Sequence, residues 1–136
     1  MAVLLIAEHN NNDLKAFTLN AATAASQIDG DLHAIIIGHN CGDASKKLSE
    51  LPLIKKVISV DAPHYENFTA ENFAPVITKV AENYTHIVCS ANTFGKNLMP
   101  RIAAHLDSSQ VSDIIKVISQ DTFLRPIYAG NAFATV

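Results

Sequence analysis

The sequence has only two cysteines, Cys41 and Cys89, which are too few for a disulfide framework. Basic residues are not in excess, because 10 Lys and Arg stand against 13 Asp and Glu and give a formal net charge of −3. A nucleic-acid-binding protein normally carries a basic patch, so this balance argues against nucleic acid as a partner. Charged residues make up 17% of the chain, which excludes a disordered or fibrous protein.

Long apolar runs are also missing. The opening run, residues 1–7, has no basic residue before it and no small-residue cleavage site after it. It is shorter than the core of a signal peptide and far shorter than the ~20 residues of a membrane span. Cys89 lies in an apolar stretch, where an inert buried thiol is the simpler interpretation. We therefore expect a reduced, cytoplasmic setting and no direct membrane insertion.

Apolar residues are plentiful, at 49% of 136 residues, which is enough for one domain to fold without staples. Strand and helix patterns alternate along the chain. Apolar runs predict five strands, at residues 3–7, 32–37, 56–60, 87–90 and 113–118. Such alternation predicts the α/β class, with a doubly wound, three-layer parallel sheet in the order 3-2-1-4-5.

Local signals predict where the helices begin. Asp13 is expected to cap the first helix. Asn72 is expected to cap a strongly amphipathic helix, so that Pro75 falls in its first turn. Pro100 is likewise expected in the first turn of a helix over residues 97–106.

The last part of the chain changes character. Residues 123–128 and 132–136 predict two strands around Gly130 and Asn131, a pair suited to a tight turn. Pro126 has no N–H to donate and predicts that its strand lies at a sheet edge. The fold prediction therefore includes a C-terminal β-hairpin.

Ligands of a doubly wound sheet bind beyond the carboxyl ends of the strands, where the strand order reverses. For the expected order this point lies between the loops at residues 8–12 and 90–97. The second loop begins a helix and could hold a phosphate, with these candidates for a cofactor contact: Ser90, Thr93, Gly95 and Lys96. Neither G-x-G-x-x-G nor G-x-x-x-x-G-K-[ST] is present. A capped helix start that binds nothing is the competing interpretation.

Histidines near Cys41 raise a second possibility. His9 and His39 follow adjacent strands, and Cys41 lies two residues beyond His39. A Cys–His nucleophile or a metal site is geometrically possible there, with Glu8 or Asp43 as an orienting acid. No H-E-x-x-H or Cys-x-x-Cys pattern supports a metal. Ordinary polar loop residues are the favoured interpretation, so no catalytic residue and no metal ligand is predicted.

Two arginines stand out as candidates for contacts with a partner. Arg101 is expected in a first helical turn, where the helix dipole favours anions, so it is expected to pair with an acid or a partner. Arg125 lies among apolar residues of the expected edge strand, and Arg and Tyr are enriched at interface hot spots. For Arg125, a functional interface and a locally paired surface side chain both stay open.

Three stretches together resemble the N-terminal domain of the electron-transfer flavoprotein alpha subunit, in the α/β ETF domain family. They are residues 3–9 (VLLIAEH), residues 94–106 (FGKNLMPRIAAHL), and residues 111–113 (VSD) followed by 123–132 (FLRPIYAGNA). The resemblance runs in order along all 136 residues. It implies a Rossmann-like fold of the adenine nucleotide alpha hydrolase-like kind.

The resemblance also implies an electron carrier rather than an enzyme, which takes electrons from flavin dehydrogenases to the respiratory chain. Such an alpha subunit forms a heterodimer with a beta subunit and holds FAD mainly through a C-terminal domain. That domain would be absent from residues 1–136, which are expected to be a truncated N-terminal domain. No cofactor is therefore expected on this chain alone.

The function expected from the resemblance is that of a scaffold and subunit-docking domain. Its expected contacts to the beta subunit or the C-terminal domain are Arg101, Arg125, Tyr128 and Asn131. The alternative is a small AMP- or ATP-binding module of the same fold, which would use the loop that begins at Ser90.

Overall fold

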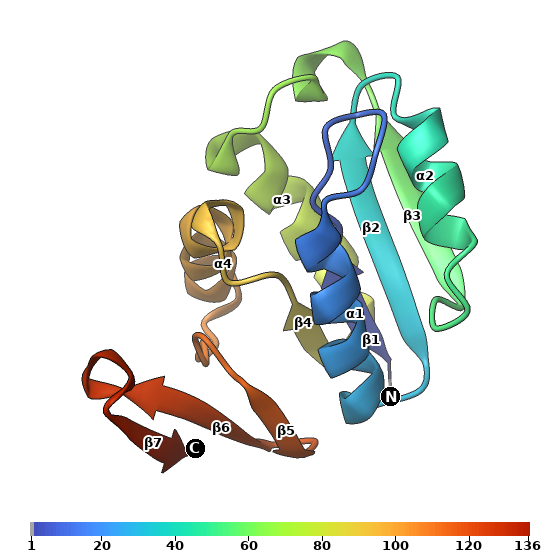
Figure 1. The fold of residues 1–136 in the computed structure, drawn as a ribbon. Helices are drawn as coiled ribbons and strands as arrows, with labels where there is room; N and C mark the ends of the chain where they lie inside the picture. Colours follow the sequence, from blue (N-terminus) through green and yellow to red (C-terminus); the bar gives the residue numbers. More distant parts are fainter. Residues whose placement is uncertain (1) are drawn as a thin grey trace.

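The computed structural model describes residues 2–136, and Met1 lies outside the described residues. An α/β body is followed by three antiparallel strands that extend from it (Figure 1). The body contains β1 (Val3–Ile6), α1 (Ala16–Ile28), β2 (Leu32–Gly38), α2 (Gly42–Ser49), β3 (Lys56–Asp61), η1 (Pro63–Tyr65), α3 (Ala70–Val80), η2 (Ala81–Asn83), β4 (His86–Val88) and α4 (Thr93–Leu106). The C-terminal part contains β5 (Lys116–Ser119), β6 (Thr122–Ile127), η3 (Tyr128–Gly130) and β7 (Ala132–Thr135). We call residues 115–136 the arm.

The body sheet is parallel, with the order β3-β2-β1-β4. The α/β class and the order of the first four strands are confirmed. The prediction that a fifth strand joins this sheet beside β4 is wrong. β5 instead pairs antiparallel with β6 in a separate sheet of order β5-β6-β7. Ser119 and Thr122 face each other across a two-residue connection. A connection this short makes the local hairpin cheap in loop-closure entropy.

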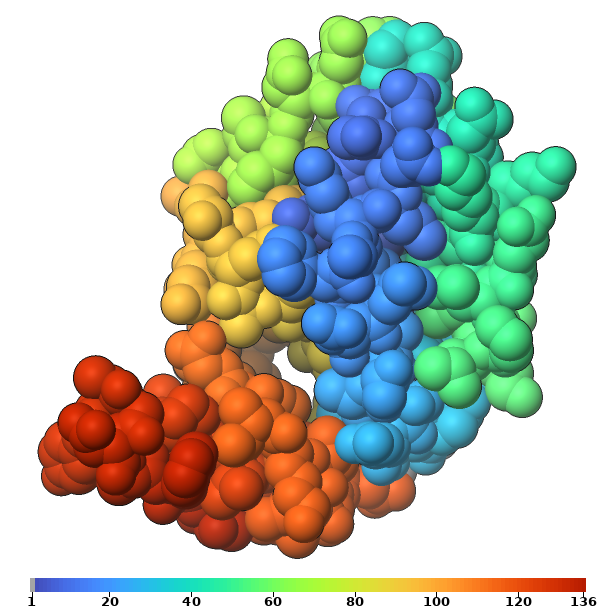
Figure 2. All heavy atoms as spheres, viewed as in Figure 1, coloured from blue at the N-terminus to red at the C-terminus, as the bar shows by residue number. Residues whose placement is uncertain are grey.

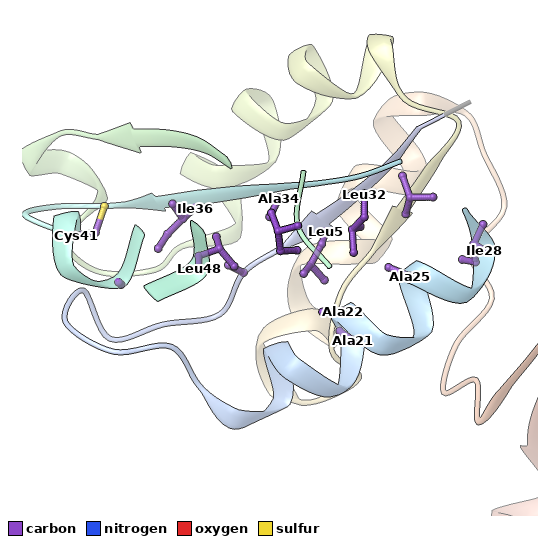
Figure 3. Close-up of a cluster of buried hydrophobic side chains, with 14 residues drawn as sticks. Leu5, Ala21, Ala22, Ala25, Ile28, Leu32, Ala34, Ile36, Cys41 and Leu48 are labelled. Carbon is purple, nitrogen blue, oxygen red and sulfur yellow. The ribbon is translucent and has the colours of Figure 1, made fainter. Parts of the chain in front are cut away.

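Helices cover both faces of the body sheet, as the three-layer prediction requires. One face of β1 and β2 packs against α1 and α2, as Figure 3 shows with Leu5 and Ala34 beside Ala22 and Ala25. The other face packs against α3 and α4. Strands covered on both sides become continuous apolar runs, which is why β1 and β2 were recognisable in the sequence.

Two predicted helix starts are wrong because prolines are tolerated inside these helices. Thr69 caps α3, and its hydroxyl accepts a hydrogen bond from the N–H of Asn72 at 3.2 Å. Pro75 and Pro100 both lie inside their helices. Both prolines are exposed, as is Glu71, whose carbonyl loses its donor at Pro75. Water can satisfy that carbonyl, which lowers the cost of the missing bond.

The expected cap of the first helix is also wrong. Lys15 occupies the cap position of α1, and an isolated bridge between His9 and Leu14 closes the loop before it. Asp13 instead forms an ion pair with Lys47 of α2.

The C-terminal hairpin is confirmed, but its turn is wider than the pair Gly130–Asn131. Tyr128, Ala129 and Gly130 have φ of 51°, 55° and 89°. Pro126 does not lie on an edge strand, because β6 is the central strand of its sheet. The pairing of β5 with β6 reaches only Leu124, so Pro126 has a partner strand on the β7 side alone. The N–H that proline lacks therefore leaves no β5 carbonyl without a donor. None of the helices described between residues 2 and 136 is long and apolar enough to cross a membrane.

Candidate functional site

The point where the strand order reverses lies between β1 and β4, which are parallel neighbours. The loops that follow these strands meet there through Glu8 and Asn92. The side-chain amide of Asn92 donates to the Glu8 carboxylate at 2.8 Å. Its carbonyl oxygen accepts from the N–H of Gly95 at 3.2 Å and so caps α4. This point of reversal, which we call the crossover, is therefore closed by hydrogen bonds from the chain's own side chains.

The four candidates for a phosphate site lie at this crossover, and their contacts are internal. The Ser90 hydroxyl donates to Asn92, and Lys96 lies 3.7 Å from Asp113. Thr93 is the first residue of α4. A Cβ on Gly95 would lie 1.8 Å from the Ser90 carbonyl oxygen, so this glycine is required by close packing of the helix on the loop.

A diphosphate group does not fit the crossover as it stands, because the Glu8 carboxylate lies beside the start of α4. Two anions at this position would repel each other. The nucleotide site at Ser90 stays a prediction, and the geometry lends it no support. Sequence reasoning missed Asn92, although an Asn three residues before Gly95 is a recognisable cap signal.

The backbone of Glu8 is held by a buried side chain that the sequence analysis did not single out. The Thr18 hydroxyl accepts from the Glu8 N–H at 2.9 Å and donates to the Glu8 carbonyl at 3.0 Å. Thr18 is buried in α1. The helix therefore positions the loop that carries the Glu8 carboxylate.

His9 is engaged by the backbone rather than available for chemistry. Its Nε2 lies 2.7 Å from the Ile37 carbonyl oxygen, and its Nδ1 accepts from the N–H of Asn11 at 2.9 Å. These two partners require a neutral ring with the proton on Nε2. Burial lowers the pKa of His9, which agrees with the neutral form. His9 therefore ties the β1 loop to β2.

Cys41 lies in a cluster with His39 and Asp61, not with the predicted acids Glu8 or Asp43. The N–H of Cys41 donates to the Asp61 carboxylate at 3.1 Å, and Nδ1 of His39 lies 3.7 Å from the same carboxylate. Hydrogen bonds from the N–H groups of Asn40 and Cys41 lower the pKa of Asp61. Burial and the charge of Asp61 raise the pKa of the Cys41 thiol. The fully buried side chain and protonated thiol argue against a nucleophile.

We expect both cysteines to react slowly with a thiol reagent in the folded protein. Burial raises the pKa of Cys89 to about 12, and the Cys41 side chain is fully buried. At pH 8, labelling of the native chain should be at least ~10-fold slower than labelling in denaturant. Rapid native labelling of Cys41, followed by mass spectrometry, would restore the Cys–His interpretation. Across residues 2–136, no three His, Cys, Asp or Glu side chains converge in a way that suits a metal ion.

The expected partner contacts do not form one group. Arg101 lies on α4 and donates to Glu71 of α3 at 3.1 Å, so it has an acid partner within the body. Arg125, Tyr128 and Asn131 all lie on the arm, where the N–H of Asn131 donates to the Tyr128 carbonyl at 3.1 Å. Nε of Arg125 is buried and has no hydrogen-bond partner among the described residues. The arm therefore carries three of the four candidates.

The arm extends away from the body and packs on it only at its base (Figures 1 and 2). Val117 and Phe123 contact the cluster between the sheet and α1. Five of the nine large apolar side chains that are exposed in the described residues lie in the arm: Ile115, Ile118, Tyr128, Phe133 and Val136. Such a concentration of exposed apolar surface is typical of a protein-binding site.

Comparison with known proteins agrees with this architecture. The electron transfer flavoprotein subunit alpha of Pseudomonas aeruginosa is 47% identical over 136 residues, which is 100% of this chain and 44% of that protein. The mitochondrial alpha subunit of Dictyostelium discoideum is 43% identical over 141 residues, or 98% of this chain and 40% of that protein. The alpha subunit of Bradyrhizobium diazoefficiens is 45% identical over 136 residues, which is 100% of this chain and 43% of that protein.

The chain thus spans less than half the length of these relatives. The family model described as electron transfer flavoprotein domain matches residues 3–136, nearly the whole chain. The resemblance in the sequence is therefore confirmed, and the chain belongs to the electron transfer flavoprotein domain family.

Proposed function

We propose that this chain is the N-terminal scaffold and subunit-docking domain of an electron transfer flavoprotein alpha subunit. In this proposal the whole protein carries electrons from flavin dehydrogenases to the respiratory chain and is not itself an enzyme. The names of the relatives support the assignment to an alpha subunit, and therefore a heterodimer with a beta subunit. A reduced, cytoplasmic setting remains our prediction for the chain.

The observation that carries the docking role is the arm. It presents aromatic and apolar side chains outward, while the buried Nε of Arg125 has no hydrogen-bond partner within residues 2–136. Stable interfaces are rich in Tyr, Phe and Arg, and a buried unpaired N–H gains most from a partner that supplies an acceptor. We therefore assign the arm as the surface that contacts the beta subunit, with Arg125 and Tyr128 near its centre and Asn131 shaping its turn.

We place most FAD contacts of the full-length protein outside residues 2–136. FAD would supply the electron-accepting ring, and its diphosphate would need positive charge or free N–H groups. The crossover offers the Glu8 carboxylate instead, and Lys96, which lies nearby on α4, is close to Asp113. In this proposal the role of the chain is to hold the rest of the assembly in place rather than to bind FAD.

The docking role is tested with the beta subunit of the same organism. Tyr128→Ala and Arg125→Ala should each weaken binding of the beta subunit by ~10- to 100-fold, since hot-spot truncations cost about 2 kcal/mol or more. Binding is measured by surface plasmon resonance on the immobilised chain. Leu53→Ala is the matched control, because Leu53 is an exposed apolar residue outside the arm. Unchanged binding by both arm variants, with normal circular dichroism, would contradict the proposal.

A further inference from the structure

Tyr84, His33 and Asp31 form a chain of hydrogen bonds at the amino end of the body sheet. The Tyr84 hydroxyl lies 2.7 Å from Nδ1 of His33, and Nε2 of the same ring lies 3.0 Å from the Asp31 carboxylate. His33 is the second residue of β2, and Tyr84 follows η2. Because Tyr84 and His33 lie 51 positions apart in the sequence, only the fold brings the phenol and the imidazole together.

The Asp31 carboxylate determines which nitrogen of His33 carries the proton. An ionised carboxylate only accepts hydrogen bonds, so Nε2 of His33 is protonated and donates to Asp31. In the neutral ring Nδ1 is then an unprotonated base, and the Tyr84 hydroxyl donates to it. A base that lies within hydrogen-bond reach of a hydroxyl, and is itself oriented by a third group, is arranged to take the proton of that hydroxyl.

The surroundings of Tyr84 keep its phenol protonated until the ring loses an electron. Burial and the negative charge of Asp31 raise the pKa of Tyr84, which disfavours loss of the proton alone and argues against a nucleophile. Oxidation reverses this preference, because a phenol that has lost one electron is a strong acid. It transfers its proton at once to a base in contact with it, and Nδ1 of His33 is that base. The geometry therefore suits coupled loss of an electron and a proton.

The other side chains of the chain compete weakly for an oxidising equivalent. The sequence has no tryptophan and three tyrosines, and both cysteine thiols have raised pKa values. Across residues 2–136, Tyr84 is the one tyrosine whose hydroxyl lies at hydrogen-bond distance from a basic side chain. Tyr65 packs edge-on against Phe73, and Tyr128 is 79% exposed. Tyr84 alone therefore has a proton acceptor already in place.

We propose that Tyr84 is a redox-active tyrosine, which an outer-sphere one-electron oxidant converts to a neutral phenoxyl radical. One electron passes from Tyr84 to the oxidant, the phenolic O–H bond breaks, and the proton forms an N–H bond at Nδ1 of His33. The Asp31 carboxylate stabilises the resulting imidazolium through Nε2. When a one-electron reductant returns the electron, the proton moves back to the phenol oxygen. This site is separate from the arm and does not depend on the docking role.

Flash photolysis of a ruthenium polypyridine complex, with persulfate present to generate the ruthenium(III) oxidant, tests the proposal on the 136-residue chain. Tyr65→Phe and Tyr128→Phe are combined, so that the phenoxyl absorption reports Tyr84 alone. In this background His33→Gln should slow radical formation by at least ~10-fold, because glutamine accepts the hydrogen bond but cannot take up the proton. His86→Gln is the matched control and should leave the rate unchanged. The His86 ring, at the same end of the sheet, bonds to a threonine hydroxyl and a backbone carbonyl instead of a tyrosine.

Two further measurements do not require a change at His33, whose replacement is checked for folding by circular dichroism. In the chain that retains only Tyr84, radical formation should be slower in heavy water, since the O–H bond breaks in the measured step. In the native chain, electron paramagnetic resonance should detect a radical that Tyr84→Phe removes and Tyr128→Phe keeps. Equal rates with and without His33, a radical that follows Tyr128, or the absence of an isotope effect would each overturn the proposal.

Discussion

Replacing Gly95 with alanine is expected to destabilise the protein by about 3 kcal/mol, because the new methyl group has no space. It would lie 1.8 Å from the Ser90 carbonyl oxygen and 3.0 Å from the carbonyl carbon. Both are backbone atoms, so no side chain can rotate away. Relief requires α4 to move off the loop after β4, which would also break the cap that Asn92 makes to the N–H of Gly95. The free energy of unfolding in urea measures the loss.

Gly42→Ala is the matched control for this substitution. Gly42 opens α2, and a Cβ there meets nothing within 4 Å. Alanine should be neutral or stabilise by up to ~1 kcal/mol, since it restricts the unfolded chain and favours a helix. If both variants changed the stability by the same amount, close packing of α4 on Ser90 would not be the reason for glycine at position 95.

Replacing Thr18 with valine is expected to cost about 2 kcal/mol, although the two side chains have nearly the same shape. The valine cannot accept from the Glu8 N–H, which the Thr18 hydroxyl holds at 2.9 Å. The Glu8 carbonyl loses less, since it also accepts from the N–H of Lys15 at 2.9 Å. The cost therefore comes mainly from one N–H without an acceptor. Thermal and urea unfolding give the change in stability.

Two controls separate the lost hydrogen bond from other effects. Thr18→Ser keeps the hydroxyl and removes one methyl group, for a cost of about 1 kcal/mol. Thr23→Val makes the same chemical change on the exposed side of α1, where the hydroxyl donates only to the Leu19 carbonyl at 3.2 Å. It should leave the stability within ~0.5 kcal/mol. A loss at Thr23 as large as that at Thr18 would mean that the helix, not Glu8, is what the hydroxyl supports.

The helix starts show why the spacing of apolar residues predicted the helices correctly, whereas the predicted helix boundaries were wrong. The apolar stripe of α3 follows from residues three and four apart, a local property. Whether Pro75 stands in the first turn or inside the helix depends on whether water reaches the carbonyl of Glu71, which is a property of the folded surface. The exposure of both residues allowed α3 to begin at Ala70.

The candidate site shows the same division. The strand order predicted that the loops after β1 and β4 meet, and they do so through Glu8 and Asn92. The glycine of the second loop suggested phosphate binding in the sequence, whereas in the fold it makes room for Ser90. The sequence shows only that a glycine is present, and the atoms around it in the fold decide whether it serves phosphate binding or close packing.

The sequence by itself determined the α/β class, the first four strands and the family, because apolar runs, helical stripes and characteristic stretches are all local. Only the tertiary structure decided where the next apolar stretch belongs. Residues 116–119 have the composition of a further sheet strand, yet they pair with β6 across a short turn and leave the edge of β4 open. Strand pairing depends on which partner strand is close in space and on the entropy of closing the loop between the two strands. Neither can be deduced from the residues of the strand itself.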